Sequence, residues 1–196
     1  MSKQDKSPSI SRFPAVVAVV AVLVTGAPAV PSASAYGVAA HGSAISGLDR
    51  VTDLPSLERR LLGEINALRR QQGLAPLRAS KGLAAAAREQ SMSMAENGFF
   101  GHESPGGSPF WKRVESMYPK PAAGSWSVGE NLVWRSPRLS AERALQLWLD
   151  SPPHRQNLLE PTWREIGIAA VHAKGAPGVY GGQDVTILTA DFGVRR

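Results

Sequence analysis

The amino-acid sequence predicts an α+β fold in which helices come first and an antiparallel pair of strands comes last. In several segments between residues 54 and 149, apolar residues recur at intervals of three and four, which is the pattern of helices with one buried face. From Ile166 to Asp191 they alternate on either side of a Gly/Pro-rich loop, as in a hairpin packed on a core. Because the two kinds of segment are not interleaved, a doubly wound parallel sheet is not expected.

Residues 1–35 are predicted to be a secretory signal peptide. Three basic residues precede an apolar run from Phe13 to Val24, and Ala33-Ser34-Ala35 fits the small-x-small cleavage rule. An uncleaved anchor is the weaker alternative, because Gly26 and two prolines break the ~20 continuous apolar residues that it needs. We therefore expect a secreted protein with no transmembrane anchor after cleavage, a flexible lead-in at 36–53 and one domain at 54–196.

Charge and cysteine content restrict the partners and the chemistry. The chain carries a net charge of +6, and removal of a leader with three bases and one acid leaves 6 − 2 = +4. Wall polymers or acidic lipid headgroups are then the anionic partners that an exported protein would meet, and no nucleic acid is expected. The simpler alternative is that the charge maintains solubility, since no run of five like charges is present. The chain has no cysteine, so any metal would be bound by histidine and carboxylate.

Two helices are predicted in the first half of the domain. The first is capped by Thr52 or Asp53, presents five leucine and isoleucine residues at helical spacing, and ends near Gln72 before a glycine. The second begins at the cap Ser80 and ends at Asn97-Gly98. Near the apolar face of the first helix, Asn66 and Arg69 are expected to be solvated, with a buried polar tether as the alternative.

The second half of the domain is predicted to contain two more helices and the strands. Ser108-Pro109 begins a third helix, Ser127 to Trp134 is expected to be extended, and a fourth helix runs from Ser140 until Pro152 ends it. A short turn holding His154 follows, and the hairpin begins at Glu165. Its loop is expected from Ala173 to Gly182.

Four titratable residues form the candidate site, which we expect to be one cleft: His102, Glu130, His154 and Glu165. Each lies in or beside a segment whose Gly and Pro residues fix the backbone. Two imidazoles with carboxylate neighbours suit Zn²⁺ or another divalent cation. His102 and His154 are the expected metal ligands, and the two glutamates could bind the ion, orient an imidazole or act as a general base. The two histidines are 52 positions apart, so their spacing alone supports a metal only weakly.

Other known site classes can be compared with the same residues. Pro105 and Gly106 prevent His102-Glu103 from opening the His-Glu-x-x-His helix of a zinc protease. No Gly-x-Ser-x-Gly motif supports Ser104 or Ser151 as a nucleophile. The pair Glu130 and Glu165 could resemble a glycosidase if the carboxyl groups lay about 5–10 Å apart, which the sequence leaves open.

A set of motifs in order along 54–194 resembles one known family. The motifs are Phe100-Gly101-His102-x-Ser104-Pro105, Gly129-Glu130-Asn131-Leu132, Trp148-x-x-Ser151-Pro152-x-His154-Arg155-x-Asn157-Leu158, Glu165-Ile166-Gly167 and Asp191-Phe192-Gly193. The set resembles the CAP superfamily of cysteine-rich secretory, antigen and pathogenesis-related proteins, and within it the cysteine-free bacterial secreted branch. Gly106 stands where bacterial relatives often have Asp, and the eukaryotic disulfides are missing.

The resemblance implies a three-layer α-β-α sandwich with a mostly antiparallel central sheet and a cleft formed by His102, Glu130, His154 and Glu165. It implies a protein that acts at the cell surface or in the medium, through a His/Glu cleft that binds a divalent metal in some relatives. Two alternatives remain open: a hydrolase of peptide or cell-wall bonds that uses a metal- or Glu-activated water, and a lipid- or sterol-binding protein. Whether the protein is an enzyme stays open. Asn131 is expected to fix a loop, Arg155 to pair with a carboxylate or be solvated, and Trp148 and Trp163 to pack in the core.

Overall fold

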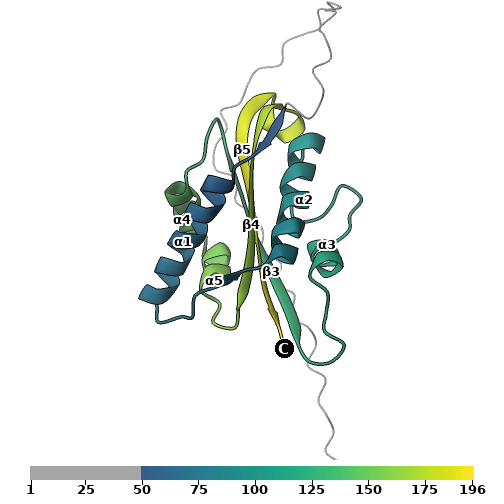
Figure 1. The fold of residues 1–196 in the computed structure, drawn as a ribbon. Coiled ribbons are helices and arrows are strands. Elements are labelled where there is room, and N and C mark those ends of the chain that lie inside the picture. The colour runs from purple at the N-terminus through teal and green to yellow at the C-terminus, as the bar shows by residue number, and fades with distance from the viewer. Residues whose placement is uncertain (1–49) are drawn as a thin grey trace, which may run out of the picture.

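The computed structural model describes residues 50–196, and in it a central sheet separates two layers of helices (Figure 1). The strands are β1 (Val51–Asp53), β2 (Arg78–Ala79), β3 (Trp126–Arg135), β4 (Glu165–Ala176) and β5 (Gln183–Arg195). The helices are α1 (Pro55–Gln71), α2 (Lys81–Asn97), α3 (Phe110–Met117), α4 (Ala141–Asp150) and α5 (Pro152–Leu159), with a 3₁₀ turn, η2 (Gly178–Tyr180), between β4 and β5. The predicted signal peptide and residues 36–49 of the lead-in lie outside the described residues.

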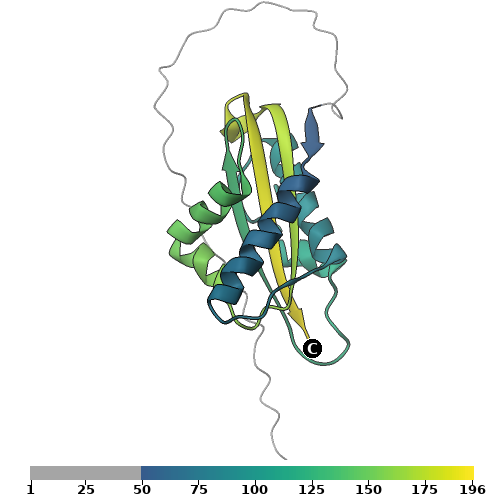
Figure 2. The same ribbon diagram turned by 60° about the vertical axis from the view of Figure 1, so that its left-hand side comes forward.

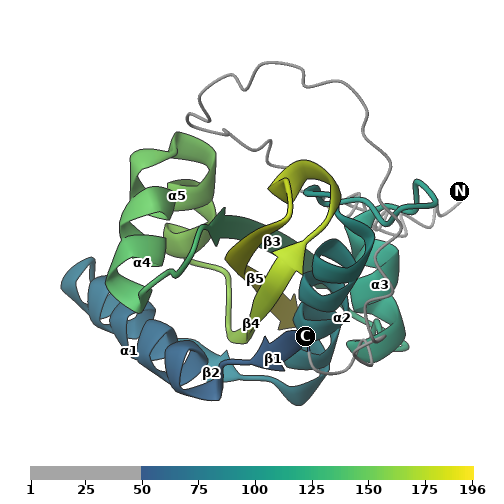
Figure 3. The same ribbon diagram turned by 90° about the horizontal axis from the view of Figure 1, so that it is seen from above.

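The sheet has the strand order β1-β4-β5-β3, and β2 also pairs with β4. All pairings are antiparallel except the short β2–β4 pair. Seen from above, α1, α4 and α5 lie on one side of the sheet and α2 and α3 on the other (Figure 3). The predicted three-layer α-β-α sandwich with a mostly antiparallel sheet is therefore confirmed.

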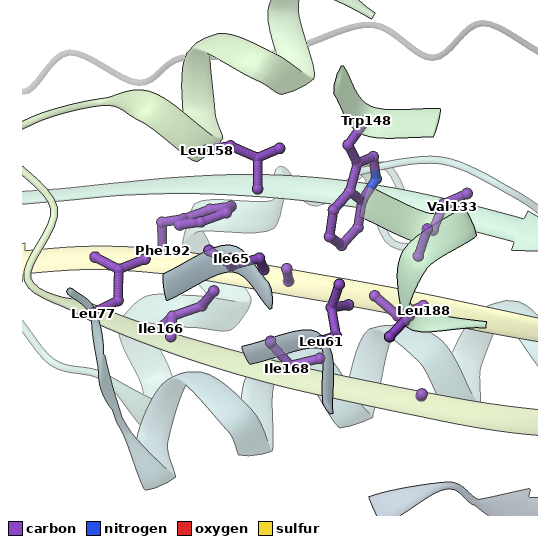
Figure 4. Close-up of a cluster of buried hydrophobic side chains, with 14 of the residues drawn as sticks. Leu61, Ile65, Leu77, Val133, Trp148, Leu158, Ile166, Ile168, Leu188 and Phe192 are labelled. Carbon is purple, nitrogen blue, oxygen red and sulfur yellow. The ribbon is translucent and has the colours of Figure 1, made fainter. Parts of the chain in front are cut away.

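The two faces of the sheet bury separate cores. Every second residue of β4 and β5, including Ile166, Leu188 and Phe192, packs with Leu61 of α1 and Trp148 of α4 (Figure 4). Helix α1 crosses this face, as Figure 2 shows. The alternate residues pack toward α2 and α3 in two further apolar clusters. Among residues 50–196, no helix has the length and apolarity needed to cross a membrane.

Several element boundaries differ from the predicted ones. Val51–Asp53 forms β1, so α1 begins at Pro55, after Leu54, and is not capped by Thr52 or Asp53. Pro152 ends α4 as expected but also begins α5, an eight-residue helix where a short turn was predicted. Both differences have a physical reason: a three-residue strand is too short to show periodicity, and proline suits the first position of a helix as well as it ends the preceding one. The Ser80 cap position, the Gly98 stop and the hairpin are confirmed, although β4 continues to Ala176, so the hairpin loop begins at Pro177 and not at Ala173.

Gly167 lets α2 approach the sheet closely. A Cβ at this position of β4 would overlap the backbone of Leu83 and Ala84. We expect Gly167→Ala to lower the free energy of unfolding by about 1–3 kcal/mol, the usual cost of overpacking a core.

Gly63→Ala is the matched control for this prediction, measured by urea denaturation. Gly63 is exposed within α1, and nothing lies within 4 Å of the point that a Cβ would occupy there. The same substitution at this position should raise the free energy of unfolding by about 0.5–1 kcal/mol, because alanine favours helix. Equal effects at the two positions would contradict the role given to Gly167.

Candidate functional site

The candidate site lies along β3, an edge strand of the sheet. Glu130 is on β3, and its side chain is on the α2/α3 side of the sheet. His102 is in the loop between α2 and α3, and its Nδ1 lies 2.7 Å from Glu130 Oε1. Gln90 of α2 holds this loop by donating a hydrogen bond to the carbonyl of Gly101, at 2.5 Å. His102 and Glu130, two of the four residues expected to share one cleft, are thus in contact.

Arg113 holds the other oxygen of the Glu130 carboxylate. Its Nη2 donates to Glu130 Oε2, its Nε donates to the carbonyl of Ala86 at 3.1 Å, and its Nη1 donates to Gln90 Oε1 at 2.6 Å. Arg113 is only 7% exposed and Glu130 only 1%. The guanidinium therefore fixes the carboxylate between α2, α3 and β3, and Glu130 is left to orient His102.

Asp191 lies directly beside Glu130 on the neighbouring strand β5. It is fully buried, and its two carboxyl oxygens find no hydrogen-bond partner among residues 50–196. Arg113 Nη2 is 3.9 Å away. Burial raises the pKa of Asp191 well above its usual range, and the negative charge of Glu130 raises that pKa further. The raised pKa favours the neutral carboxylic acid, which avoids placing a second buried negative charge beside Glu130.

His154 reaches the site from α5, on the opposite side of the sheet. The Asn131 side chain donates to the carbonyl of His154 at 3.0 Å, and Asn157 donates to the carbonyl of Glu130 at 3.2 Å and to Asn131 Oδ1 at 3.0 Å. These bonds fasten α5 to β3. The role predicted for Asn131, fixing the backbone near the site, matches these contacts, although Asn131 lies in a strand and not in a loop.

Arg69 fastens the far end of α5 to α1. It is fully buried and donates to the carbonyls of Leu158 at 2.8 Å and Glu160 at 3.1 Å, and to that of Ala75 at 2.9 Å. A cation is favourable at the carbonyl end of a helix. The expectation of a solvated Arg69 is therefore wrong, and the alternative of a buried tether holds for it. Asn66 is half-buried and also forms a tether, since its side chain bonds to the backbone of Leu77.

The imidazole of His154 is 5% exposed and stays neutral at physiological pH. Burial lowers its pKa to about 4, and the electrostatic interaction with nearby His102 contributes in the same direction. The Nε2 atoms of His154 and His102 are both buried and find no hydrogen-bond partner among the described residues. The two imidazoles are close enough to interact electrostatically, and within residues 50–196 each has an Nε2 atom without a hydrogen-bond partner.

Glu165 has its own set of contacts. It lies at the start of β4, level with Gly193 of β5 and Val128 of β3, whereas Glu130 lies level with Asp191. Glu165 accepts a hydrogen bond from Tyr118 Oη at 2.6 Å, and Arg195 Nε is 3.7 Å away. Burial, and then the hydrogen bond to Glu165, raise the pKa of Tyr118 above its usual range. The structure thus groups His102, Glu130 and His154, and places Glu165 two strands away on the same face.

Fewer residues are available as metal ligands than the four expected from the sequence. In residues 50–196, no group of three or more His, Cys, Asp or Glu side chains is arranged to hold a metal ion. Both oxygens of Glu130 are engaged, one by His102 and one by Arg113. With Nδ1 of His102 donating to the carboxylate, Nε2 of a neutral ring carries the lone pair. His102 and His154 are therefore the residues that could ligate a metal, with Glu130 orienting one of them.

The sequence reasoning missed Arg113 and Asp191 as parts of this site. Asp191 carried a usable signal, because it continues the inward-facing positions Val185, Ile187 and Thr189 of the predicted strand. A carboxyl group at such a position must be paired or neutral. Arg113 carried no such signal within its own helix. Trp148 and Trp163 are buried as predicted, and exposed Arg155 donates to the carbonyl of Leu149.

A family model described as the cysteine-rich secretory protein family, CAP, matches residues 62–191. A relative in Bacillus subtilis (strain 168), named "Uncharacterized protein YkwD", is 30% identical over 123 residues, which are 62% of this chain and 45% of the relative. The chain therefore spans less than half the length of that relative.

Two solved structures are similar in fold. One is an extracellular protein containing a SCP domain from Bacillus anthracis str. Ames, with a TM-score of 0.56 and 25% identity over 72% of this chain and 41% of that one. The other is an outer surface protein from Borrelia burgdorferi, with a TM-score of 0.57 and 21% identity over 74% of this chain and 98% of that one. The second likeness concerns the fold alone.

Proposed function

Because the chain belongs to the cysteine-rich secretory protein (CAP) family, we propose that it acts outside the cell or at its surface by holding a divalent metal ion between His102 and His154. The extracellular location is supported by the predicted signal peptide and by the similar Bacillus anthracis protein, which is described as extracellular. The metal is supported by one observation above all: two buried imidazole Nε2 atoms without a partner among the described residues.

The chain's own residues prepare these two nitrogens for a cation. Burial keeps His154 neutral, so its ring has a lone pair to offer. Glu130 orients the ring of His102, as carboxylates behind metal-binding histidines do. When bound, a Zn²⁺ ion would supply a Lewis-acidic position with coordination sites left open. The buried and fully engaged Glu130 favours this orienting role over that of a general base.

Adding Zn²⁺ at neutral pH is expected to raise Tm by roughly 5–10 °C when the metal is at about a hundred times its Kd. His102→Ala and His154→Ala should each abolish the rise, since each removes one of two ligands. His172→Ala is the matched control: His172 lies on β4 and is half-buried, and its removal should leave the rise unchanged. Differential scanning fluorimetry measures Tm, and elemental analysis measures the amount of bound zinc. A wild-type protein with no bound zinc and no rise in Tm would contradict the proposal.

A further inference from the structure

A second charged feature lies at the far end of β3, apart from the His102–His154 site. A surface hollow of about 500 Å³ opens between the end of β3 and the start of α4. It is lined by Arg135, Arg138, Leu139, Ser140 and Arg143. Arg135 is five residues beyond Glu130 on the same strand, which is roughly 16 Å at the rise of a β-strand. The hollow is therefore separate from the metal-site candidate.

The three arginines around this hollow lack acidic partners. Within residues 50–196, four other arginines form salt bridges with carboxylates, whereas Arg135, Arg138 and Arg143 form none. The nearest acid along the chain is Glu142, whose carboxylate interacts with its own backbone N–H, with the Ser140 hydroxyl and with Arg60 at 3.5 Å, and with none of the three arginines of the hollow. Three cations around one concavity repel one another, so the arrangement gains most from an anion placed between them.

The start of α4 adds to the same positive potential. The helix has ten residues and begins at the wall of the hollow, directly after Ser140. Ser140 Oγ accepts the backbone N–H of Arg143 at 3.2 Å and caps the helix, while its hydroxyl interacts with the carboxylate of Glu142. The amino end of a helix carries partial positive charge and favours anions. The arginines and the amino end of α4 thus both contribute positive potential to the hollow.

We propose that this hollow, defined by Arg135, Arg138, Ser140 and Arg143, binds the phosphate group of a phosphate ester. Guanidinium groups match phosphate oxygens in a two-pronged geometry, and three of them can serve the several oxygens of one tetrahedral group. A volume of about 500 Å³ also holds the alcohol that carries the phosphate. Such a group could belong to a soluble polyol phosphate chain or to a lipid headgroup, and the chemistry of recognition is the same for both.

The full-length chain is tested with two probes. Glycerol 3-phosphate is titrated while backbone amides are followed by NMR, and binding to phosphatidylcholine vesicles with and without phosphatidylglycerol is measured by co-sedimentation. We expect saturable shifts at Ala141 and Glu142, the first two residues of α4. Binding of glycerol 3-phosphate without vesicle binding identifies a soluble ester, and vesicle binding alone identifies a headgroup. Binding of neither probe overturns the proposal.

Two charge-matched triple variants distinguish a built site from general positive charge. Changing Arg135, Arg138 and Arg143 together to Gln should weaken the observed binding by at least about tenfold. The control changes Arg50, Arg59 and Arg70 to Gln, which are equally exposed but line no part of the hollow, and should change it less than about twofold. Equal losses in the two variants, or amide shifts spread over the whole basic surface, would overturn the proposal. Because all six side chains are exposed, unchanged Tm values serve as the check that both variants fold.

Discussion

Replacing Arg113 with Met is expected to lower the free energy of unfolding by about 3–5 kcal/mol, because it leaves the buried carboxylate of Glu130 without its cation. Glu130 is 1% exposed and forms its ion pair with Arg113 Nη2. Asp191 lies next to it, and burial and the charge of Glu130 raise the pKa of Asp191. Met fills much of the same volume as Arg, so the lowered free energy of unfolding would come mainly from the lost charge and only to a small extent from a cavity.

The hydrogen bonds of Arg113 add to this cost. Its guanidinium also serves the Ala86 carbonyl and Gln90 Oε1, and Gln90 in turn holds the loop that carries His102. Removing the donor leaves buried acceptors unsatisfied, which is costlier than never burying them. The effect should therefore extend to the loop at 98–109, and we expect faster amide hydrogen exchange there in the variant.

Lys112→Met is the control for this prediction, since Lys112 is the exposed neighbour of Arg113 on α3. It should change the free energy of unfolding by less than about 0.5 kcal/mol. In a Glu130→Gln background, where no carboxylate needs the cation, Arg113→Met should cost clearly less, giving a coupling energy above about 1 kcal/mol. Urea denaturation of the four proteins measures the cycle. An equal cost in both backgrounds would show that the ion pair is not the cause.

The fold could be predicted from the sequence wherever a local signal sets the structure. Ser80 before α2 and Gly98 after it, at φ 68°, are local signals of this kind. The alternation in β4 and β5 is another. By contrast, β1 and β2 are strands only because β4 lies beside them. Their three and two residues carry no pattern of their own, so local sequence could not have predicted them.

The site could be predicted only in part, because its geometry depends on contacts between distant segments. His102, Glu130 and His154 were found through motifs, and the structure brings these three together. Arg113 was not found, since its burial depends on Glu130, 17 positions away on another element. Glu165 was grouped with the others through its own motif, and the structure gives it Tyr118 and Arg195 as neighbours. Charge pairing across layers is a tertiary property that residue type does not reveal.

His154 is expected to make the protein less stable as the pH falls from about 6.5 to about 4. Its pKa in the folded protein is about 4, whereas an unfolded histidine titrates near 6.5. Between these values the unfolded chain binds the proton and the folded chain does not, so stability rises with pH in this window. This difference in pKa lowers the free energy of unfolding by about 3 kcal/mol. The loss is nearly full at pH 4, and there is none above pH 7.

Asp191 has the opposite effect on stability as the pH changes, so its contribution must be measured separately from that of His154. Its raised pKa means that the folded protein keeps a proton that the unfolded chain releases near pH 4, so its contribution is lost as the pH rises. In metal-free buffer, His154→Gln should therefore remove the loss on the acid side, and Asp191→Asn should make that loss steeper. The free energy of unfolding from urea denaturation between pH 4 and pH 7.5 gives the three curves. If the difference between the wild type and His154→Gln stays constant over this range, burial does not hold His154 neutral, and the lone pair required of it as a metal ligand would have to be explained in another way.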